Sequence, residues 1–260
     1  MELFWVSLAA FLASCLTFFS GFGLGTLLMP VVALFLPVEV AIAVTAIVHL
    51  ANNLFKWALV GKKVDRSVQS VLWRFGVPAV LAALLGAWLL NMLSGLPTLF
   101  EYQWLGREFA VSVVKFIIGV LILAFVWLEL SPRFAKMSFD ARYLPLGGAL
   151  SGFFGGLSGH QGAFRSMFLL KSGLDSQRFI ATGVVLAVLV DVARMLVYGW
   201  NFSASTAHIQ WTMVLSASLS AFVGAYLGAQ LLHKVTLRTI QRLVSVLLVL
   251  IGLGLVTGLL

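Results

Sequence analysis

The sequence predicts an all-α polytopic membrane protein built from two inverted repeats of five segments each. Three observations lead to this prediction. Hydrophobic residues make up 61% of the 260 residues and charged residues only 10%, whereas a soluble domain carries about 25% charged residues. Apolar stretches follow one another with little chain between them, and the two halves of the chain align without a gap. We therefore expect all functional chemistry to lie within the bilayer or at its faces.

The apolar stretches have the composition of membrane helices. They lie at residues 4–19, 22–36, 39–60, 71–92, 109–130, 143–157, 162–171, 176–198, 209–232 and 240–260. The first two stretches of each half are shorter than the about 20 residues that a full span needs. We expect short broken or re-entrant helices, linked by glycine turns deep in the protein, to open each repeat, because irregular backbone at that depth must be buried or line a cavity. Tilted full spans are the alternative.

The repeat itself is an alignment of residues 21–61 with residues 159–199 at a constant offset of 138. The matched positions are mostly glycine or polar: Gly21 with Gly159, Ala43 with Ala181, Asn53 with Asp191, Lys56 with Arg194, Gly61 with Gly199 and, further on, Gly86 with Gly224. A basic residue three positions after an amide or acid and five before a glycine is hard to repeat by chance. The sequence thus indicates a first membrane repeat at 1–130, a cytoplasmic linker at 131–142 and a second repeat at 143–260.

Basic residues concentrate in three of the connections between apolar stretches. They are Lys62, Lys63 and Arg66; Arg133, Lys136 and Arg142; and Lys234, Arg238 and Arg242. Such loops face the cytoplasm, whereas 93–108 and 199–208 should face the other side. The loop after 39–60 and its counterpart after 176–198 then lie on opposite sides, so the repeats are inverted and both termini are non-cytoplasmic. The net charge of +8 thus reports topology, and not a nucleic-acid partner.

Each repeat opens on a glycine-rich turn. The first contains Gly21, Gly23 and Gly25, and the second contains Gly159, His160 and Gln161, with Arg165 shortly after it. Glycine permits close backbone approach and leaves N–H groups free at the start of the next helix, where the helix dipole favours an anion. We interpret both turns as ligand contacts; close helix packing alone is the alternative.

Polar side chains form a stripe on the third stretch of each repeat. His49, Asn52, Asn53 and Lys56 are spaced i, i+3, i+4 and i+7, which puts them on one helix face. Because polar groups are costly in hydrocarbon, the stripe should face a cavity or another helix. A polar packing seam, with Lys56 extending to the cytoplasmic surface, is the alternative.

The counterpart of this stripe in the second repeat carries Asp191 and Arg194, which share a helix face with Tyr198. Asp191 and Arg194 can pair on the helix surface, and pairing lowers the cost of keeping either charge in the membrane. A purely structural ion pair is the alternative. It would leave Arg165 and Lys56 as the more available positive charges.

The opening run Gly21-Phe22-Gly23-Leu24-Gly25-Thr26-Leu27-Leu28-Met29-Pro30, followed by Leu36-Pro37, resembles the glycine-rich signature of the TauE/SafE family of sulfite exporters. That family repeats the signature in its second half, where this chain has Gly159-His160-Gln161-Gly162-Ala163. The resemblance implies an inner-membrane permease that moves sulfite or organosulfur anions such as sulfoacetate, usually outward. The chain departs from the family pattern at Leu24, Gln161 and Ala163, which replace glycines, and at Phe168, which replaces a proline.

The leading hypothesis is therefore a secondary transporter of a small sulfur-containing anion, which by this resemblance acts as an exporter. The anion would be bound by Lys56, Arg165 and Arg194, with Asn52 and Asn53 as donors. A transporter for metal cations or proton-coupled solutes that uses His49, His160 and Asp191 is one alternative, and a non-transporting membrane scaffold is another. The sequence has no P-loop, HExxH or GxSxG motif. We therefore predict that the protein is not an enzyme and that it has no cofactor and no metal site. The expected partners are the anion and the lipid bilayer, and a homodimer is left open.

Overall fold

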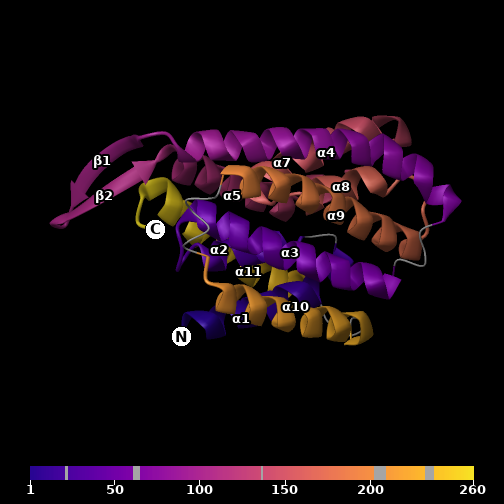
Figure 1. Cartoon of the computed structure of the whole chain (residues 1–260), viewed down its shortest axis with the longest axis horizontal. Coiled ribbons are helices and arrows are strands. Elements are labelled where there is room, and N and C mark those ends of the chain that lie inside the picture. The colour runs from indigo at the N-terminus through magenta and orange to yellow at the C-terminus, as the bar shows by residue number, and fades with distance from the viewer. Residues whose placement is uncertain (21–22, 61–64, 136, 202–208, 232–236) are drawn as a thin grey trace.

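The protein is a bundle of helices that run along one long axis, with a single β-hairpin at one end (Figure 1). This structure, a computed structural model, describes residues 1–20, 23–60, 65–135, 137–201, 209–231 and 237–260. In chain order the elements are α1 (Glu2–Ser20), α2 (Leu24–Val32), α3 (Val38–Val60), α4 (Arg66–Ser94), β1 (Thr98–Trp104), β2 (Arg107–Ser112), α5 (Val113–Leu130), α6 (Pro132–Ala135), the 3-10 helix η2 (Ala141–Tyr143), α7 (Leu144–Ser158), α8 (Gly162–Leu169), α9 (Ser176–Asn201), α10 (Trp211–Leu231) and α11 (Leu237–Thr257).

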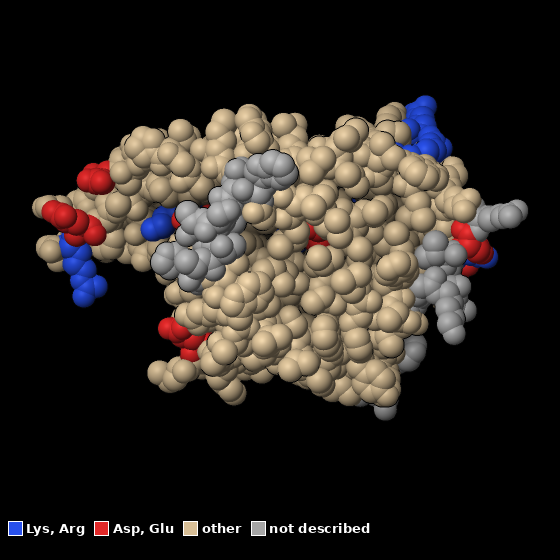
Figure 2. Space-filling view, viewed as in Figure 1, with Lys and Arg blue, Asp and Glu red and all other residues tan. Residues whose placement is uncertain are grey.

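The predicted apolar stretches are helices, and the molecule is an all-α polytopic membrane protein. Within the described ranges α3, α4, α9 and α10 are long and apolar enough to cross a membrane. Leu81 and Leu85 on α4, like Leu215 and Leu219 on α10, are exposed and one turn apart, as lipid-facing side chains would be. Figure 2 shows that the charged side chains on this face gather toward the two ends of the long axis and leave its middle almost without charge.

The two halves have the same order of helices and pack on each other reciprocally. At the offset of 138, α1 corresponds to α7, α2 to α8, α3 to α9 and α4 to α10. The helix α1 packs on α10, and its counterpart α7 packs on α4; α3 packs on α9, and α5 on α11. Two copies of one unit related by a twofold axis would pack in this way. The boundaries at 1–130 and 143–260 remain a prediction.

Glycine allows the closest of these helix contacts. A Cβ on Gly152 of α7 would lie 2.0 Å from the carbonyl oxygen of Ala79 on α4. The equivalent glycines Gly86 and Gly224 are alike in this respect, because a Cβ on them would lie 2.2 Å from Phe153 O and 2.3 Å from Phe11 O, respectively. Only a residue without a side chain lets the two backbones come this close.

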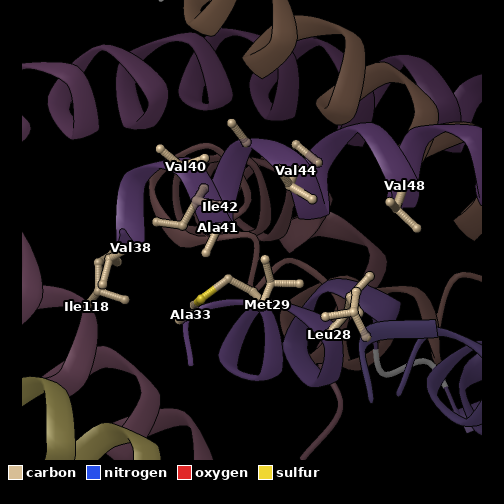
Figure 3. Close-up of a cluster of buried hydrophobic side chains, with 14 of the residues drawn as sticks. Leu28, Met29, Ala33, Val38, Val40, Ala41, Ile42, Val44, Val48 and Ile118 are labelled. Atoms are coloured by element: carbon tan, nitrogen blue, oxygen red, sulfur yellow. The ribbon is translucent and has the colours of Figure 1, made fainter. Parts of the chain in front are cut away.

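The short helix α2 packs on α1 and α3, and a cluster of buried apolar side chains holds it against α3 (Figure 3). Leu28 and Met29 of α2 face Val44 and Val48 of α3, and Ile118 of α5 lies beside the start of α3. A helix of nine residues is marginal by itself, so this packing fixes its position. It thereby fixes the glycine turn from which α2 begins.

The hairpin of β1 and β2 was not predicted, because the sequence analysis placed a loop at 93–108 and the start of a helix at 109. Leu105 and Gly106 have positive φ values of 52° and 74°, the conformation of a two-residue hairpin turn. Because strand β2 is apolar, hydropathy alone does not distinguish it from the beginning of the apolar helix α5. Tyr102 donates a hydrogen bond to Thr257 O at 2.5 Å, which joins the hairpin to the end of α11. Both termini lie at this end of the molecule (Figure 1).

At the opposite end an ion-pair cluster joins the two halves. Arg178, at the start of α9, lies 2.7 Å from Asp65, which precedes α4, and 3.0 Å from Asp175. The backbone N–H of Arg178 lowers the pKa of Asp175 below its usual range, so Asp175 is charged at neutral pH. Because exposed ion pairs contribute little to stability, we regard this cluster as a positional contact. Other residues of the predicted loops lie outside the described ranges: Gly61, Lys62, Lys63, Lys136 and Lys234.

Candidate functional site

The centre of the polar cluster is the carboxylate of Asp191 on α9, which is fully buried. One oxygen accepts hydrogen bonds from His49 Nδ1 at 2.6 Å and Asn53 Nδ2 at 3.1 Å, both from α3. The other accepts from Gln161 Nε2 at 3.1 Å and from Arg194 Nε and Nη2 at 3.1 and 2.7 Å. The two hydrogen bonds from the guanidinium of Arg194 favour the ionised form of Asp191. The predicted pair of Asp191 and Arg194 is confirmed.

Asn53 and Asp191 are equivalent positions of the two repeats, separated by 138 residues, and they touch. Equivalent positions on two symmetry-related helices meet only where the helices cross the axis that relates them. The cluster therefore lies where the two halves of the molecule face each other. The pair also breaks the symmetry chemically, because an amide stands opposite a carboxylate.

The two glycine turns approach each other at this place, as predicted. A Cβ on Gly25 would lie 3.4 Å from Gly159 O, and one on Gly23 would lie 3.6 Å from His49 Nε2. Gly159 has a φ of +83°, a conformation that favours glycine. Gly21 lies outside the described residues. The helices α2 and α8 start from these turns, and neither start has a side-chain cap.

Arg165, on the first turn of α8, is connected to Asp191 through Gln161. Its Nη1 donates to Gln161 Oε1 at 3.1 Å, while the amide nitrogen of Gln161 donates to Asp191. Ser151 on α7 holds the turn in place, because its hydroxyl donates to Gln161 O at 2.9 Å. By contrast, Arg194 is bonded to Asp191 directly and also donates to Gly155 O at 3.4 Å. Gln161 is one of the residues by which this chain departs from the family motif.

Lys56 is buried within the protein, with 5% of its surface exposed. The alternative in which its side chain extends to the cytoplasmic surface is therefore wrong. The Lys56 end of the predicted stripe is thus inside the protein, as expected of a binding face.

Asn52 and His160 belong to the edges of the cluster, and the structure gives neither a hydrogen bond to Asp191. Asn52 Oδ1 accepts from Ser14 on α1 at 3.0 Å. His160 Nδ1 lies 3.1 Å from Ser158 O, and its ring stacks on Phe125 at 4.8 Å. Ser14 and Ser151 were missed by sequence reasoning, because a single serine in an apolar helix carries no distinguishing signal.

Four buried polar atoms have no hydrogen-bond partner within the described part of the chain. They are Thr45 Oγ1, Asn52 Nδ2, His160 Nε2 and Thr182 Oγ1. Folded proteins leave few such atoms, and each calls for an explanation. Thr45 lies one helical turn before His49, and its methyl group lies against Gly25, so one of the four residues borders the glycine turns.

The buried charges of the cluster are unbalanced. Lys56, Arg165 and Arg194 are basic residues, and Asp191 is the one acid among the buried residues that the structure describes. Moving a charged group out of water costs several kcal/mol or more in real proteins, by rough estimate. The site is therefore suited to a negatively charged partner.

A multi-pass helical protein with a buried polar centre between two glycine-linked hairpins has the architecture of a membrane transporter. The family model of the sulfite exporter TauE/SafE matches residues 6–255, and the chain belongs to this family of membrane transporters. The resemblance inferred from the glycine turns is thereby confirmed. No curated protein and no solved structure matches the chain.

Proposed function

We propose that this protein is a secondary transporter that exports a small sulfur-containing oxyanion, such as sulfite or an organosulfonate, across the inner membrane. The observation that carries the proposal is the excess of buried positive charge where the two halves meet. Lys56, Arg165 and Arg194 are at most 8% exposed, and one carboxylate, Asp191, accompanies them. A bound anion would offset this excess.

The donors around the cluster suit an oxyanion in particular. Guanidinium groups bind planar or tetrahedral oxyanions through paired N–H bonds. The amide of Asn52 and the hydroxyl of Thr45 have no other partner in the described residues. The starts of α2 and α8 add uncapped backbone N–H groups, which favour negative charge. Sulfite and sulfonate oxygens would accept from all of these groups.

The packing suggests how access to such a site would alternate. Described groups of the cluster come from both halves, and their side chains are buried. Inverted-repeat transporters bind substrate near the midplane and expose it alternately as one part rocks against the other. Rocking of the α1–α10 pair against the α4–α7 pair would move the walls while the α3–α9 crossing keeps the cluster together.

The test is a substrate screen with purified protein in proteoliposomes at a fixed membrane potential. Sulfite, thiosulfate, sulfate, sulfoacetate and divalent metal ions are compared, with protein-free liposomes as the control. We expect flux of at least one sulfur oxyanion and no flux of metal ions. Flux of metal ions alone would support the cation alternative, and the absence of all flux would support a scaffold.

The structure gives the cation alternative no specific support. Within the described residues no group of three or more His, Cys, Asp and Glu side chains could hold a metal ion. The acid that this alternative requires, Asp191, is already bonded to His49, Asn53, Gln161 and Arg194. A carboxylate with these donors is a poor cation ligand.

A further inference from the structure

The imidazole of His49 connects the Asp191 carboxylate to the glycine turn of the first half. Its Nδ1 lies 2.6 Å from Asp191 Oδ2. Its Nε2 faces Gly23, where an added Cβ would lie 3.6 Å away. Gly23 precedes the uncapped start of α2, and the unpartnered Thr45 hydroxyl belongs to the same helix face. Nδ1 thus contacts the resident carboxylate, whereas Nε2, which lies 3.4 Å from Asn53 Nδ2, borders the site proposed for the anion.

The hydrogen bonds of Asp191 determine which ring nitrogen of His49 carries hydrogen. An ionised carboxylate can only accept, so Nδ1 carries the hydrogen in this contact, and the amide of Asn53, whose Nδ2 lies 3.0 Å from Nδ1, donates to Asp191 Oδ2 instead. A neutral imidazole has a single N–H group, which leaves a lone pair on Nε2. That lone pair would repel an oxyanion at the start of α2. An imidazolium, in contrast, donates from both nitrogens at once.

We propose that His49 takes up one proton from solvent when an anion binds, so that the loaded site carries the proton together with the anion. This inference rests on the proposed anion-transport function. In the loaded state, Nδ1–H donates to Asp191 and Nε2–H donates to an oxygen of the anion. When the anion leaves, the proton on Nε2 returns to solvent.

The charges around His49 make its protonation responsive to an anion. From α9 it contacts Asp191, whose negative charge favours the imidazolium. Arg194 is bonded to the same carboxylate and Arg165 is connected to it through Gln161, and their positive charges oppose the imidazolium. On the same helix, α3, Lys56 lies two turns after His49. An anion beside the two arginines offsets their opposition and so favours the charged ring.

The other helices that pack on α3 add little charge near His49. The described residues of α2 and α10 include no Asp, Glu, Lys, Arg or His. Lys115 lies in the first turn of α5, one turn before Ile118, which sits beside Val38 at the start of α3 (Figure 3). That place is about three helical turns from His49.

The experiment measures proton uptake by the purified wild-type protein in detergent, in weakly buffered solution with a pH indicator. The titrants are thiosulfate and sulfate, because sulfite itself exchanges protons near neutral pH. We expect about one proton taken up per anion bound, and an anion affinity that weakens by up to about tenfold per unit of rising pH around neutrality.

The variant His49→Gln removes the titrating ring but keeps a side-chain N–H donor. We expect it to bind the anion with no proton uptake and with an affinity that does not change with pH. The variant His160→Gln removes the second buried histidine of the same cluster and tests which ring takes up the proton: uptake that is lost in His160→Gln but kept in His49→Gln would assign the proton to His160 and overturn the inference.

Three results would overturn the inference. The first is wild-type protein that binds anion without proton uptake, which leaves the proposed function standing. The second is His49→Gln protein that still takes up the proton. The third is wild-type protein that binds no anion of the panel, including sulfite and sulfoacetate, which overturns the proposed function as well. If His49→Gln does not fold, the wild-type measurement decides alone.

Discussion

Arg165 and Arg194 are both buried arginines of the second half, but their contacts give them different tasks. Arg194 makes two bonds to Asp191 and one to Gly155 O. Arg165 is bonded to the neutral oxygen of Gln161. The positive charge of Arg194 is thus largely balanced by Asp191, whereas that of Arg165 is balanced only through an intermediate amide. Arg165 is the better candidate for the substrate contact.

We predict that Arg165→Ala weakens anion binding by about 10- to 100-fold, the equivalent of one charged hydrogen bond, and that the protein still folds. Arg194→Ala should instead destabilise the fold by about 3–5 kcal/mol, because Asp191 would lose its cation while still buried. Transport rates normalised to folded protein, and thermal stability with and without anion, separate the two effects.

Wild-type anion affinity in the Arg165→Ala variant would show that Arg165 is only an anchor. The binding site would then lie along the face from His49 to Lys56. The conservative variant Arg165→Lys serves as control: it keeps the charge but not the paired donors, so we expect an intermediate affinity.

Helical spacing predicted which side chains of the cluster share a face, but not which of them touch. His49, Asn53 and Lys56 follow from their positions on one helix, and Asp191 with Arg194 follow from the repeat. The connection from Arg165 through Gln161 to Asp191 depends on side-chain rotamers across three elements. Sequence periodicity contains no information on such rotamers. For the same reason the bond between Ser14 and Asn52 was not foreseen.

At the scale of elements, glycine positions both helix pairs that join the halves. We predict that Gly86→Ala and Gly224→Ala each destabilise the protein by about 1–3 kcal/mol, because the new methyl group would overlap a backbone carbonyl that cannot move aside easily. The matched control is Gly199→Ala within α9, where an added Cβ meets no atom within 4 Å. Thermal unfolding in detergent is the measurement.

Gly199→Ala should leave stability unchanged or raise it by about 0.5–1 kcal/mol, since alanine is the better helix former. Equal loss of stability in all three variants would contradict the role given to the close contacts. A loss at Gly86 but not at Gly224 would show that only one of the equivalent contacts matters.

The helices were predictable because each combines length with uniform apolar character, and the hairpin was not. Strand β2 contains Phe109, Ala110 and Val111 directly before the apolar helix α5. A short apolar run does not distinguish strand from helix by periodicity. The turn residues Leu105 and Gly106 were the available signal, and leucine is unusual at a positive φ.

At the scale of the whole molecule, the ends at which the equivalent helices α3 and α9 begin agree with the charges of the loops. The helix α3 begins at the end that holds both termini and the hairpin, whereas α9 begins at the opposite end (Figure 1). Loop charge and repeat register predicted this reversal from the sequence. The fold itself does not determine which end of the molecule faces the cytoplasm. That orientation is predicted from the basic loops alone.

The final prediction concerns the sidedness of the two repeats in the membrane. Glu39 and Gln177 are equivalent positions, 138 residues apart, at the second residue of α3 and of α9. With Cys15, the one cysteine, replaced by serine, we expect Glu39→Cys to react with a membrane-impermeant thiol reagent from the non-cytoplasmic side. Gln177→Cys should react only from the cytoplasmic side, because basic loops are retained there. Leu105→Cys, at the 83% exposed hairpin turn, serves as control and should label with Glu39→Cys. Labelling of Glu39→Cys and Gln177→Cys from the same side would overturn the inversion, and with it the argument that the cluster at Asp191 lies between two oppositely oriented units.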